Sequence, residues 1–400
     1  MAHNIGSALP LVDDPRDVRP VAESGRPARI LALDGLRLFA ALAVVAYHYM
    51  AFGGGWPGDV KAMFPRVFPF AAYGWLGVQL FFLISGFVIC MSCWGKPLRD
   101  FFVSRVVRLY PAYWFGVIVT TLVVTLVAGG EKPLALVEVL TNLTMLQEPL
   151  GIPHVDGVYW TLFAELRFYL LFAIVAWKGL TYNRLVVFCC VWATASFFFA
   201  DQDDSALQLL VMPDDSWYFI AGIAFYLMYR FRPNLMLTGI VLMCFFACLP
   251  FAHTTWKNTG KYIGHVVPFW PVIPIVAACF GVMALLATGK LSWIKWRWLP
   301  TAGALTYPLY LLHENIGREI FHVLGPRVPA YALVGGVIAG MLVFSWLVHR
   351  FVERPVGRWL KRGLVHAMSQ HPRSGPDAMS AGERRAEAPA EREAVAEQKQ

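Results

Sequence analysis

The sequence predicts an all-α protein, a polytopic bundle of about ten transmembrane helices whose N and C termini both lie in the cytoplasm. The chain is 58% hydrophobic with a mean hydropathy of +0.53, which is too apolar for a soluble domain of 400 residues. Apolar runs of about 20 residues, the length that crosses a bilayer, recur along the chain. Basic residues gather in short segments between these runs, as in cytoplasmic loops. The net charge of +8 therefore indicates membrane orientation, and we expect no nucleic-acid partner.

Composition divides the chain into three segments. Residues 1–28 are polar and proline-rich and lack the apolar core of a signal peptide, so we expect a disordered cytoplasmic tail. Residues 29–362 hold all the apolar runs and are expected to form one multi-pass domain in the inner (plasma) membrane. Residues 363–400 are charged and rich in Ala and Glu, which favours a disordered tail or a frayed helix.

The first expected span, residues 31–52, carries Asp34, Arg37 and His48 within or beside its apolar run. Ionisable side chains are costly inside a bilayer and are rarely left there without a role. Arg37 and His48 are eleven residues apart, which at about 100° per residue makes about three turns plus 20°, so both share one face, about 16 Å apart along the axis. A neutral imidazole is suited to accept a proton from a hydroxyl. The alternative is a histidine that is hydrogen-bonded to a neighbouring helix.

The second expected span is residues 71–93, and it contains Ser85 and Gly86 at its middle. Small residues there allow a neighbouring backbone to approach closely. We therefore expect a packing notch, with a chemical role for Ser85 as the alternative.

A basic segment precedes the third expected span, residues 110–128, and Pro111 is expected in the first turn of that helix. The segment marks the cytoplasmic side of the membrane. It is also suited to hold the phosphates of an anionic cosubstrate, because guanidinium groups match phosphate oxygens. Its cations are Lys96, Arg99, Arg105 and Arg108.

The fourth expected span is residues 158–177, in which Glu165 and Tyr169 share one helix face. A carboxylate is costly in lipid, so Glu165 is expected either to face a polar cavity or to pair with an arginine. The preceding stretch, residues 129–158, is expected outside, with residues 134–146 lying in the interface.

Six further spans complete the prediction, and His313 and Glu314 lie at the far end of the ninth span. They are expected at residues 185–200, 216–229, 235–251, 266–286, 299–317 and 331–351. All seven cysteines fall in or at the ends of apolar runs, where a buried hydrophobic role is the default. Cys90 and Cys93 form a CxxC pair, but it stands alone, so we expect no metal site.

Six short motifs, in this order and at these membrane positions, together resemble the acyltransferase 3 family of membrane sugar O-acyltransferases. The resemblance covers about residues 29–358. The motifs are LDGLR (33–37) followed by His48, FFLISGF (81–87), RVVRLYPAYW (105–114), YWTLFAELRFYL (159–170), TYPLYLLH (306–313) and RFVERP (350–355).

The resemblance implies an integral-membrane enzyme that moves an acyl group from acyl-CoA to a hydroxyl of a sugar or glycoconjugate. Acetyl-CoA is the simplest donor, acyl-CoA is a cosubstrate and no bound cofactor is expected. His48 is implied to be the general base and Arg37 its essential partner, with Glu165 orienting the imidazole or the acceptor. An acyl-histidine intermediate is the alternative to direct transfer. Donor binding is expected at Asp34, Arg105, Arg108, Tyr110 and Trp160.

Some members carry a C-terminal hydrolase-like domain, which we do not expect in this chain. The other expected contacts of the protein are the acceptor and membrane lipid. A second class of protein is also compatible with the residues, namely a proton-coupled transporter or exporter that uses Asp34, Glu165 and His48 as a relay. A channel would leave the arginine–histidine face unexplained.

Overall fold

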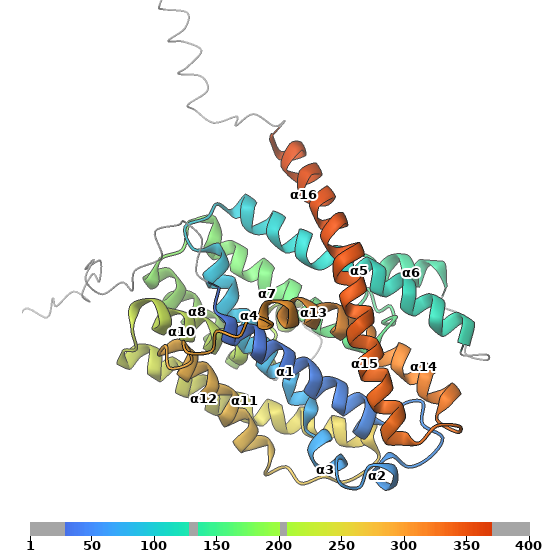
Figure 1. The fold of residues 1–400 in the computed structure, drawn as a ribbon. Helices are drawn as coiled ribbons and strands as arrows, with labels where there is room; N and C mark the ends of the chain where they lie inside the picture. Colours follow the sequence, from blue (N-terminus) through green and yellow to red (C-terminus); the bar gives the residue numbers. More distant parts are fainter. Residues whose placement is uncertain (1–28, 128–134, 201–205, 370–400) are drawn as a thin grey trace, which may run out of the picture.

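The computed structural model describes residues 29–127, 135–200 and 206–369, and this part of the chain is helical, without a β-strand. Figure 1 shows the helices gathered in one bundle, with α15 and α16 running end to end along one side. The helices are α1 (Leu31–Tyr47), α2 (Val60–Met63), α3 (Phe68–Ala71), α4 (Gly77–Cys93), α5 (Leu98–Val127), α6 (Leu136–Asn142), α7 (Trp160–Trp177), α8 (Tyr182–Phe198), α9 (Ala206–Val211), α10 (Ser216–Phe231), α11 (Leu235–Ile263), α12 (Val272–Ala287), α13 (Leu299–Leu312), α14 (Glu314–Leu324), α15 (Ala330–Val348) and α16 (Arg354–Ser369).

Six helical segments of the described chain are long and apolar enough to cross a membrane. They are Leu31–Phe52, Phe68–Cys93, Leu98–Val127, Gly157–Trp177, Leu235–Ile263 and Ala330–Met368. The helices α8 and α12 are also apolar but shorter. The predicted all-α membrane bundle is confirmed, whereas the count of ten spans and the cytoplasmic position of both termini stay predictions. The two predicted tails lie largely outside the described residues, although α16 continues to Ser369, past the predicted boundary at residue 362.

The bundle is centred on a close contact between α4 and α10. A Cβ added to Gly86 would lie 2.2 Å from the carbonyl oxygen of Phe219, and one added to Gly222 would lie 2.2 Å from that of Leu83. Both backbones therefore meet with no room for a side chain. The predicted packing notch at Gly86 is confirmed, and its partner is Gly222.

This contact predicts that Gly86→Ala destabilises the bundle. A methyl group there must push the two helices apart, and overpacking of this kind costs about 1–3 kcal/mol. We expect a lower midpoint of thermal unfolding in detergent than for the wild type. The control is Gly336→Ala, because a Cβ at Gly336 on α15 meets no atom within 4 Å. Equal midpoints for the two variants would contradict the packing argument.

The third span differs from its prediction, because α5 starts at Leu98 rather than near Tyr110. The basic segment is helical and is supported by α16, where Arg99 Nη2 donates to the carbonyl oxygen of Val365 at 2.8 Å. The placement of Pro111 in the first helical turn is therefore wrong, since it lies inside α5. Neighbouring polar groups allow a proline inside a membrane helix.

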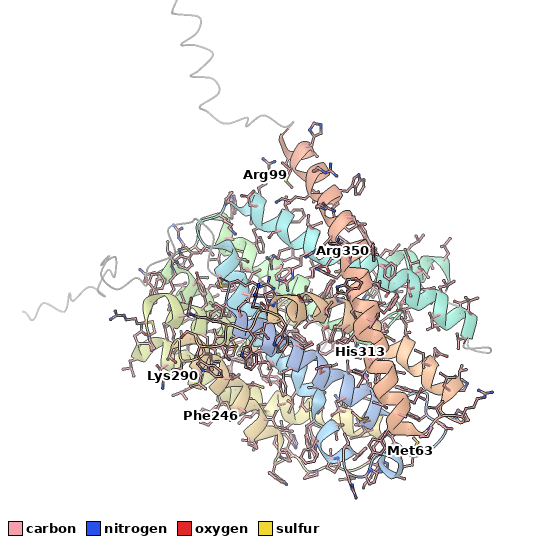
Figure 2. All side chains as sticks on the ribbon, in the orientation of Figure 1. Met63, Arg99, Phe246, Lys290, His313 and Arg350 are labelled. Atoms are coloured by element: carbon pink, nitrogen blue, oxygen red, sulfur yellow. The ribbon has the colours of Figure 1, made fainter. Side chains whose placement is uncertain are left out.

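The ninth span is also interrupted. The prediction of one helix over residues 299–317 is wrong, because α13 ends at Leu312 and α14 begins at Glu314. The hydroxyl of Tyr49 donates to the carbonyl oxygen of His313 at 2.8 Å, and His313 Nδ1 lies 2.8 Å from that of Tyr310. These bonds satisfy backbone groups at the break. In Figure 2, His313 lies between Arg350, near the predicted cytoplasmic end, and Met63, in the predicted outer loop.

Candidate active site

The first turn of α1 places a buried carboxylate beside Arg37. Arg29 Nε donates to Asp34 Oδ2 at 2.7 Å, and Arg29 Nη2 donates to Oδ1 at 3.2 Å. Arg37 Nη1 is more distant, 3.9 Å from Asp34 Oδ1. A Cβ at Gly303 on α13 would lie 2.3 Å from Asp34 Oδ1, so this carboxylate fits only against a glycine. Arg29 is the closer partner of Asp34, which leaves the guanidinium of Arg37 largely available to the interior.

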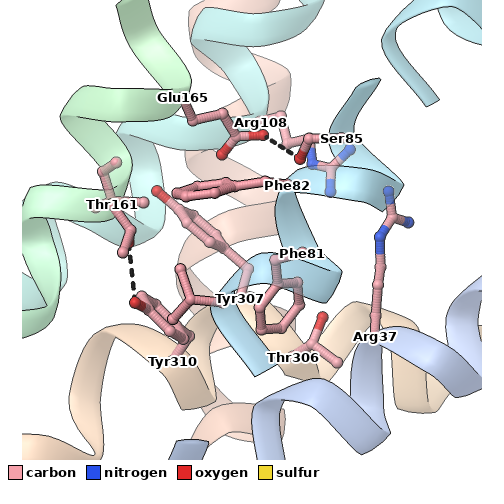
Figure 3. A pocket seen from close by; sticks show the side chains of 12 residues that line it. Arg37, Phe81, Phe82, Ser85, Arg108, Thr161, Glu165, Thr306, Tyr307 and Tyr310 are labelled. Atoms are coloured by element: carbon pink, nitrogen blue, oxygen red, sulfur yellow. Dashed lines mark hydrogen bonds between the residues drawn. The ribbon is translucent and has the colours of Figure 1, made fainter. Parts of the chain in front are cut away.

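Arg37 lines a cavity of about 70 Å³ together with Arg108 and Glu165 (Figure 3). Four helices, α1, α4, α5 and α7, contribute to it with α13. In Figure 3 the guanidinium groups of Arg37 and Arg108 lie along one wall. We call it the guanidinium cavity; its lining is Arg37, Val78, Phe81, Phe82, Ser85, Arg108, Thr161, Leu162, Glu165, Thr306, Tyr307 and Tyr310.

Two like charges share this cavity, because Arg108 lies close enough to Arg37 to repel it electrostatically. Arg108 makes no hydrogen bond or ion pair with another residue in the described part of the chain. Arg37 also lies near the carboxylates of Asp34 and Glu165. A guanidinium without such a partner, as at Arg108, can bind an anionic group through charge-assisted hydrogen bonds.

Glu165 faces the guanidinium cavity as predicted. Its Oε1 accepts a hydrogen bond from Ser85 Oγ at 3.1 Å and a second, short one from the hydroxyl of Tyr169. Within the described ranges Glu165 forms no ion pair with an arginine. Its partners are thus hydroxyl groups, and Ser85 on α4 takes part in the polar lining as well as in the notch beside Gly86.

His48 lies in a neighbouring cavity of about 350 Å³. We call this cavity the imidazole cavity; it is lined by Val44, Tyr47, His48, Phe52, Trp75, Val78, Gln79, Gly157, Val158, Trp160, Thr255, Thr259, Tyr262, Tyr310 and Glu314. At His48 the backbone changes from α-helix to one turn of π-helix, η2 (His48–Phe52), and such turns are frequent at functional sites. Val78 and Tyr310 line both cavities, so the two cavities adjoin at these side chains.

The structure gathers some of the predicted site residues and separates others. Arg105 and Tyr110 line neither cavity but an apolar groove between α5 and α7. Arg105 Nη2 donates to Ser92 Oγ at 3.3 Å, and its guanidinium carbon lies 5.6 Å from the ring centroid of Tyr169. Tyr110 donates to the carbonyl oxygen of Thr144 at 3.2 Å. Arg105 therefore approaches the guanidinium cavity only through Tyr169.

Sequence reasoning assigned no role to Glu314, yet this carboxylate is an ion-pair neighbour of His48. Glu314 Oε1 lies 3.6 Å from His48 Nδ1, and the two side chains are only 13% and 14% exposed. The signal was present in the sequence, because an acidic residue beside a histidine ends an apolar run. What the sequence lacks is the break at His313, which turns Glu314 toward α1.

The apolar helical bundle thus encloses two guanidinium groups beside a buried imidazole, which together form a polar site inside an integral-membrane protein. No cluster of three or more His, Cys, Asp or Glu side chains able to hold a metal occurs among the described residues. The chain belongs to the acyltransferase 3 family, since the family's profile, described as an acyltransferase domain, matches residues 30–350. The protein is therefore an acyltransferase, and its apolar helices make it a multi-pass membrane protein.

Several acyltransferases and related proteins are similar to the chain in sequence. The chain is 26% identical over 395 residues to acyltransferase MdmB of Streptomyces mycarofaciens, covering 87% of this chain and 96% of that protein. It is 27% identical over 381 residues to nodulation protein 10 of Rhizobium leguminosarum, covering 85% and 92%. A shorter match, 31% over 98 residues, joins 23% of this chain to 13% of the peptidoglycan O-acetyltransferase OatA of Listeria monocytogenes. No solved structure matches the chain.

Proposed function

We propose that this acyltransferase moves an acyl group, acetyl in the simplest case, from acyl-CoA to a hydroxyl of a sugar or glycoconjugate. The observation that carries the proposal is the pair of adjoining cavities. One holds the guanidinium groups of Arg37 and Arg108, the other holds His48, and they share the lining residues Val78 and Tyr310. Acyl-CoA is a long molecule, so its phosphates could bind in the first cavity while its thioester reaches the second.

The donor's phosphates would bind the arginines. Acyl-CoA carries its phosphates at one end of a thin pantetheine arm and its thioester at the other. Guanidinium groups bind phosphate oxygens by charge-assisted hydrogen bonds. With the phosphates near Arg108 and Arg37, the arm would lead the thioester past Val78 and Tyr310 toward His48. Arg105 would contribute from the outer edge, through Tyr169.

His48 would serve as the general base. A proton leaves the acceptor hydroxyl for the imidazole as the oxygen attacks the thioester carbonyl, and general-base catalysis contributes about 10²–10⁴ in rate. Glu165 with its hydroxyl partners Ser85 and Tyr169 would keep the adjoining cavity polar along the path of the donor.

The sugar acceptor is supported by the relatives and by the lining of the imidazole cavity. Relatives include a peptidoglycan O-acetyltransferase, which supports a sugar acceptor. The aromatic side chains of Trp75, Trp160 and Tyr262 line the imidazole cavity and offer apolar ring faces to a sugar. The basic segments between the apolar helices support an orientation in which the guanidinium cavity faces the cytoplasm, where acyl-CoA would be supplied to a protein of the inner membrane.

The experiment that tests the proposal uses the full-length protein in nanodiscs. We expect free CoA thiol to appear from acetyl-CoA only when a sugar acceptor is present, together with an acylated product seen by mass spectrometry. A transporter, the second candidate class, would instead move solute into proteoliposomes without consuming thioester. Solute uptake without acceptor-dependent thiol release would overturn the proposed function.

A further inference from the structure

We propose that Glu314 is the positioning residue of His48, and that Asp156 and Gly157 hold its carboxylate in place. This inference rests on the proposed function, because it assigns a partner to the base. Under this proposal His48 Nδ1–H donates to the carboxylate of Glu314. The imidazole is then held with Nε2 facing the cavity and the acceptor hydroxyl.

The first support is a set of buried polar atoms around His48. His48 Nδ1 and Glu314 Oε2 are buried and have no hydrogen-bond partner among the described residues. His48 Nδ1 faces Glu314 Oε1 at 3.6 Å, slightly beyond hydrogen-bond length. Catalytic hydrogen bonds are often long in the unliganded state and shorten when substrate binds. Unsatisfied buried groups are costly, so their retention here favours a role in the reaction.

The second support is the way in which the chain fixes the start of α14. Asp156 is fully buried, and its Oδ2 accepts from the backbone N–H of Asn315 at 3.1 Å. Its Oδ1 accepts from the N–H of Val158 at 3.2 Å, and the side chain of Asn315 donates to the carbonyl oxygen of Val155 at 2.8 Å. One carboxyl group thus ties the start of α7 to the start of α14 and sets the position of Glu314.

Gly157 supplies the space for the carboxylate. A Cβ on Gly157 would lie 2.8 Å from Glu314 Oε2 and 2.9 Å from Oε1. The backbone at Gly157 is therefore in contact with both oxygens of Glu314. Any larger residue would displace the carboxylate from His48.

Asp156 and Glu314 form a pair of adjacent buried carboxyl groups. Burial raises the pKa of both groups, and the neighbouring Glu314 carboxyl raises the pKa of Asp156 further, well above its usual range. Two adjacent buried carboxyls share one proton, and in the proposed arrangement Asp156 holds it while Glu314 carries the charge. The other titratable or charged groups near Glu314 are His48, Tyr47, Tyr159, Tyr310 and Arg318.

Acyl transfer under this proposal moves one proton by way of His48 Nε2. The acceptor hydroxyl gives its proton to His48 Nε2 while its oxygen forms the new C–O bond to the acyl carbon. The carboxylate of Glu314 stabilises the imidazolium, as an acidic residue does in hydrolase triads. The C–S bond breaks, and the thiolate of CoA takes the proton from Nε2. His48 returns to its neutral form with Nδ1–H still directed at Glu314.

Replacement by the isosteric amide is the first test, with enzyme in nanodiscs. We expect Glu314→Gln to lower kcat by about 10²-fold or more, while KM for donor and acceptor changes less than about threefold. Without the negative charge His48 protonates less readily, so the acid limb of the pH–rate profile moves to lower pH. Glu314→Asp should recover part of kcat. The control is Glu138→Gln, since Glu138 only caps the remote helix α6.

Gly157→Ala tests the geometry while Glu314 itself is retained. We expect a loss of about tenfold or more in kcat, because the added methyl moves the carboxylate away from His48. The matched control is Gly58→Ala, where a Cβ meets no atom within 4 Å. Unfolding midpoints near the wild-type value would show that both variants fold.

The outcomes separate this inference from the proposed function. If Glu314→Gln and Gly157→Ala keep wild-type kcat and pH profile while His48→Ala is inactive, Glu314 does not position the base. If His48→Ala keeps wild-type activity, the general-base role of His48 fails, and with it the part of the proposed function on which this inference rests. Under the inference, His48→Ala combined with Glu314→Gln is no slower than His48→Ala alone, because the two residues act as a unit.

Discussion

His48→Ala is expected to abolish acyl transfer. Among the described residues, His48 is the one histidine that lines the imidazole cavity, and its Nδ1 already faces a carboxylate. Its removal takes away the general-base contribution of about 10²–10⁴ in kcat and whatever stabilisation the imidazolium gives to the transition state. The measurement is acceptor-dependent release of CoA thiol by protein in nanodiscs, at saturating donor and acceptor.

The matched control for this variant is His322→Ala. His322 lies on α14, near His313 in the chain, but is exposed and lines neither cavity. We expect it to keep wild-type activity and the same unfolding midpoint. Equal rates for His48→Ala and His322→Ala, in samples with equal amounts of folded protein, would end the general-base account.

Arg108→Gln is expected to raise KM for acyl-CoA by about 10- to 100-fold with a smaller change in kcat. The guanidinium of Arg108 lines the cavity and has no hydrogen-bond or ion-pair partner among the described residues, so its hydrogen bonds are available to phosphate. Loss of a charge-assisted hydrogen bond costs about 1.5–3 kcal/mol, and each 1.4 kcal/mol is about tenfold in affinity. Arg108→Lys should fall between, because lysine keeps the charge but loses the planar fork.

The control for Arg108→Gln is Lys361→Gln. Lys361 is an exposed cation on α16 that lines neither cavity, so its loss changes net charge without touching the site. We expect its KM for acyl-CoA to stay within about twofold of the wild-type value, since exposed charges contribute little at physiological salt. A similar rise in both variants would indicate general attraction of the donor rather than a phosphate site.

The fold class followed from hydropathy alone, and the limits of the first and fourth spans agree with the structure to within one residue. Hydropathy failed where polar residues continue a helix. The basic segment before Pro111 belongs to α5, and α16 packs beside it. A hydropathy window along the sequence cannot show this contact between distant segments. The break at His313 was missed for the same reason, because Asp156, more than 150 residues away in sequence, accepts a hydrogen bond from the backbone at the start of α14.

The candidate site was predictable in part. Helical periodicity placed Arg37 and His48 on one face, and the structure puts them on adjoining cavities. The cost of a carboxylate in lipid predicted a polar setting for Glu165, which Ser85 and Tyr169 provide. Spacing could not show that Arg105 faces a separate groove while Arg108, three residues on, faces the cavity. Nor could it bring Glu314 to His48, because that contact depends on tertiary packing across α1 and α14.

The central claim is that the guanidinium cavity binds the donor while His48 acts in the chemistry. It is tested most directly by equilibrium binding of CoA to His48→Ala and Arg108→Gln in nanodiscs, measured by calorimetry. The account predicts wild-type affinity for His48→Ala and affinity weaker by about tenfold or more for Arg108→Gln. Undiminished binding to Arg108→Gln together with lost binding to His48→Ala would contradict it.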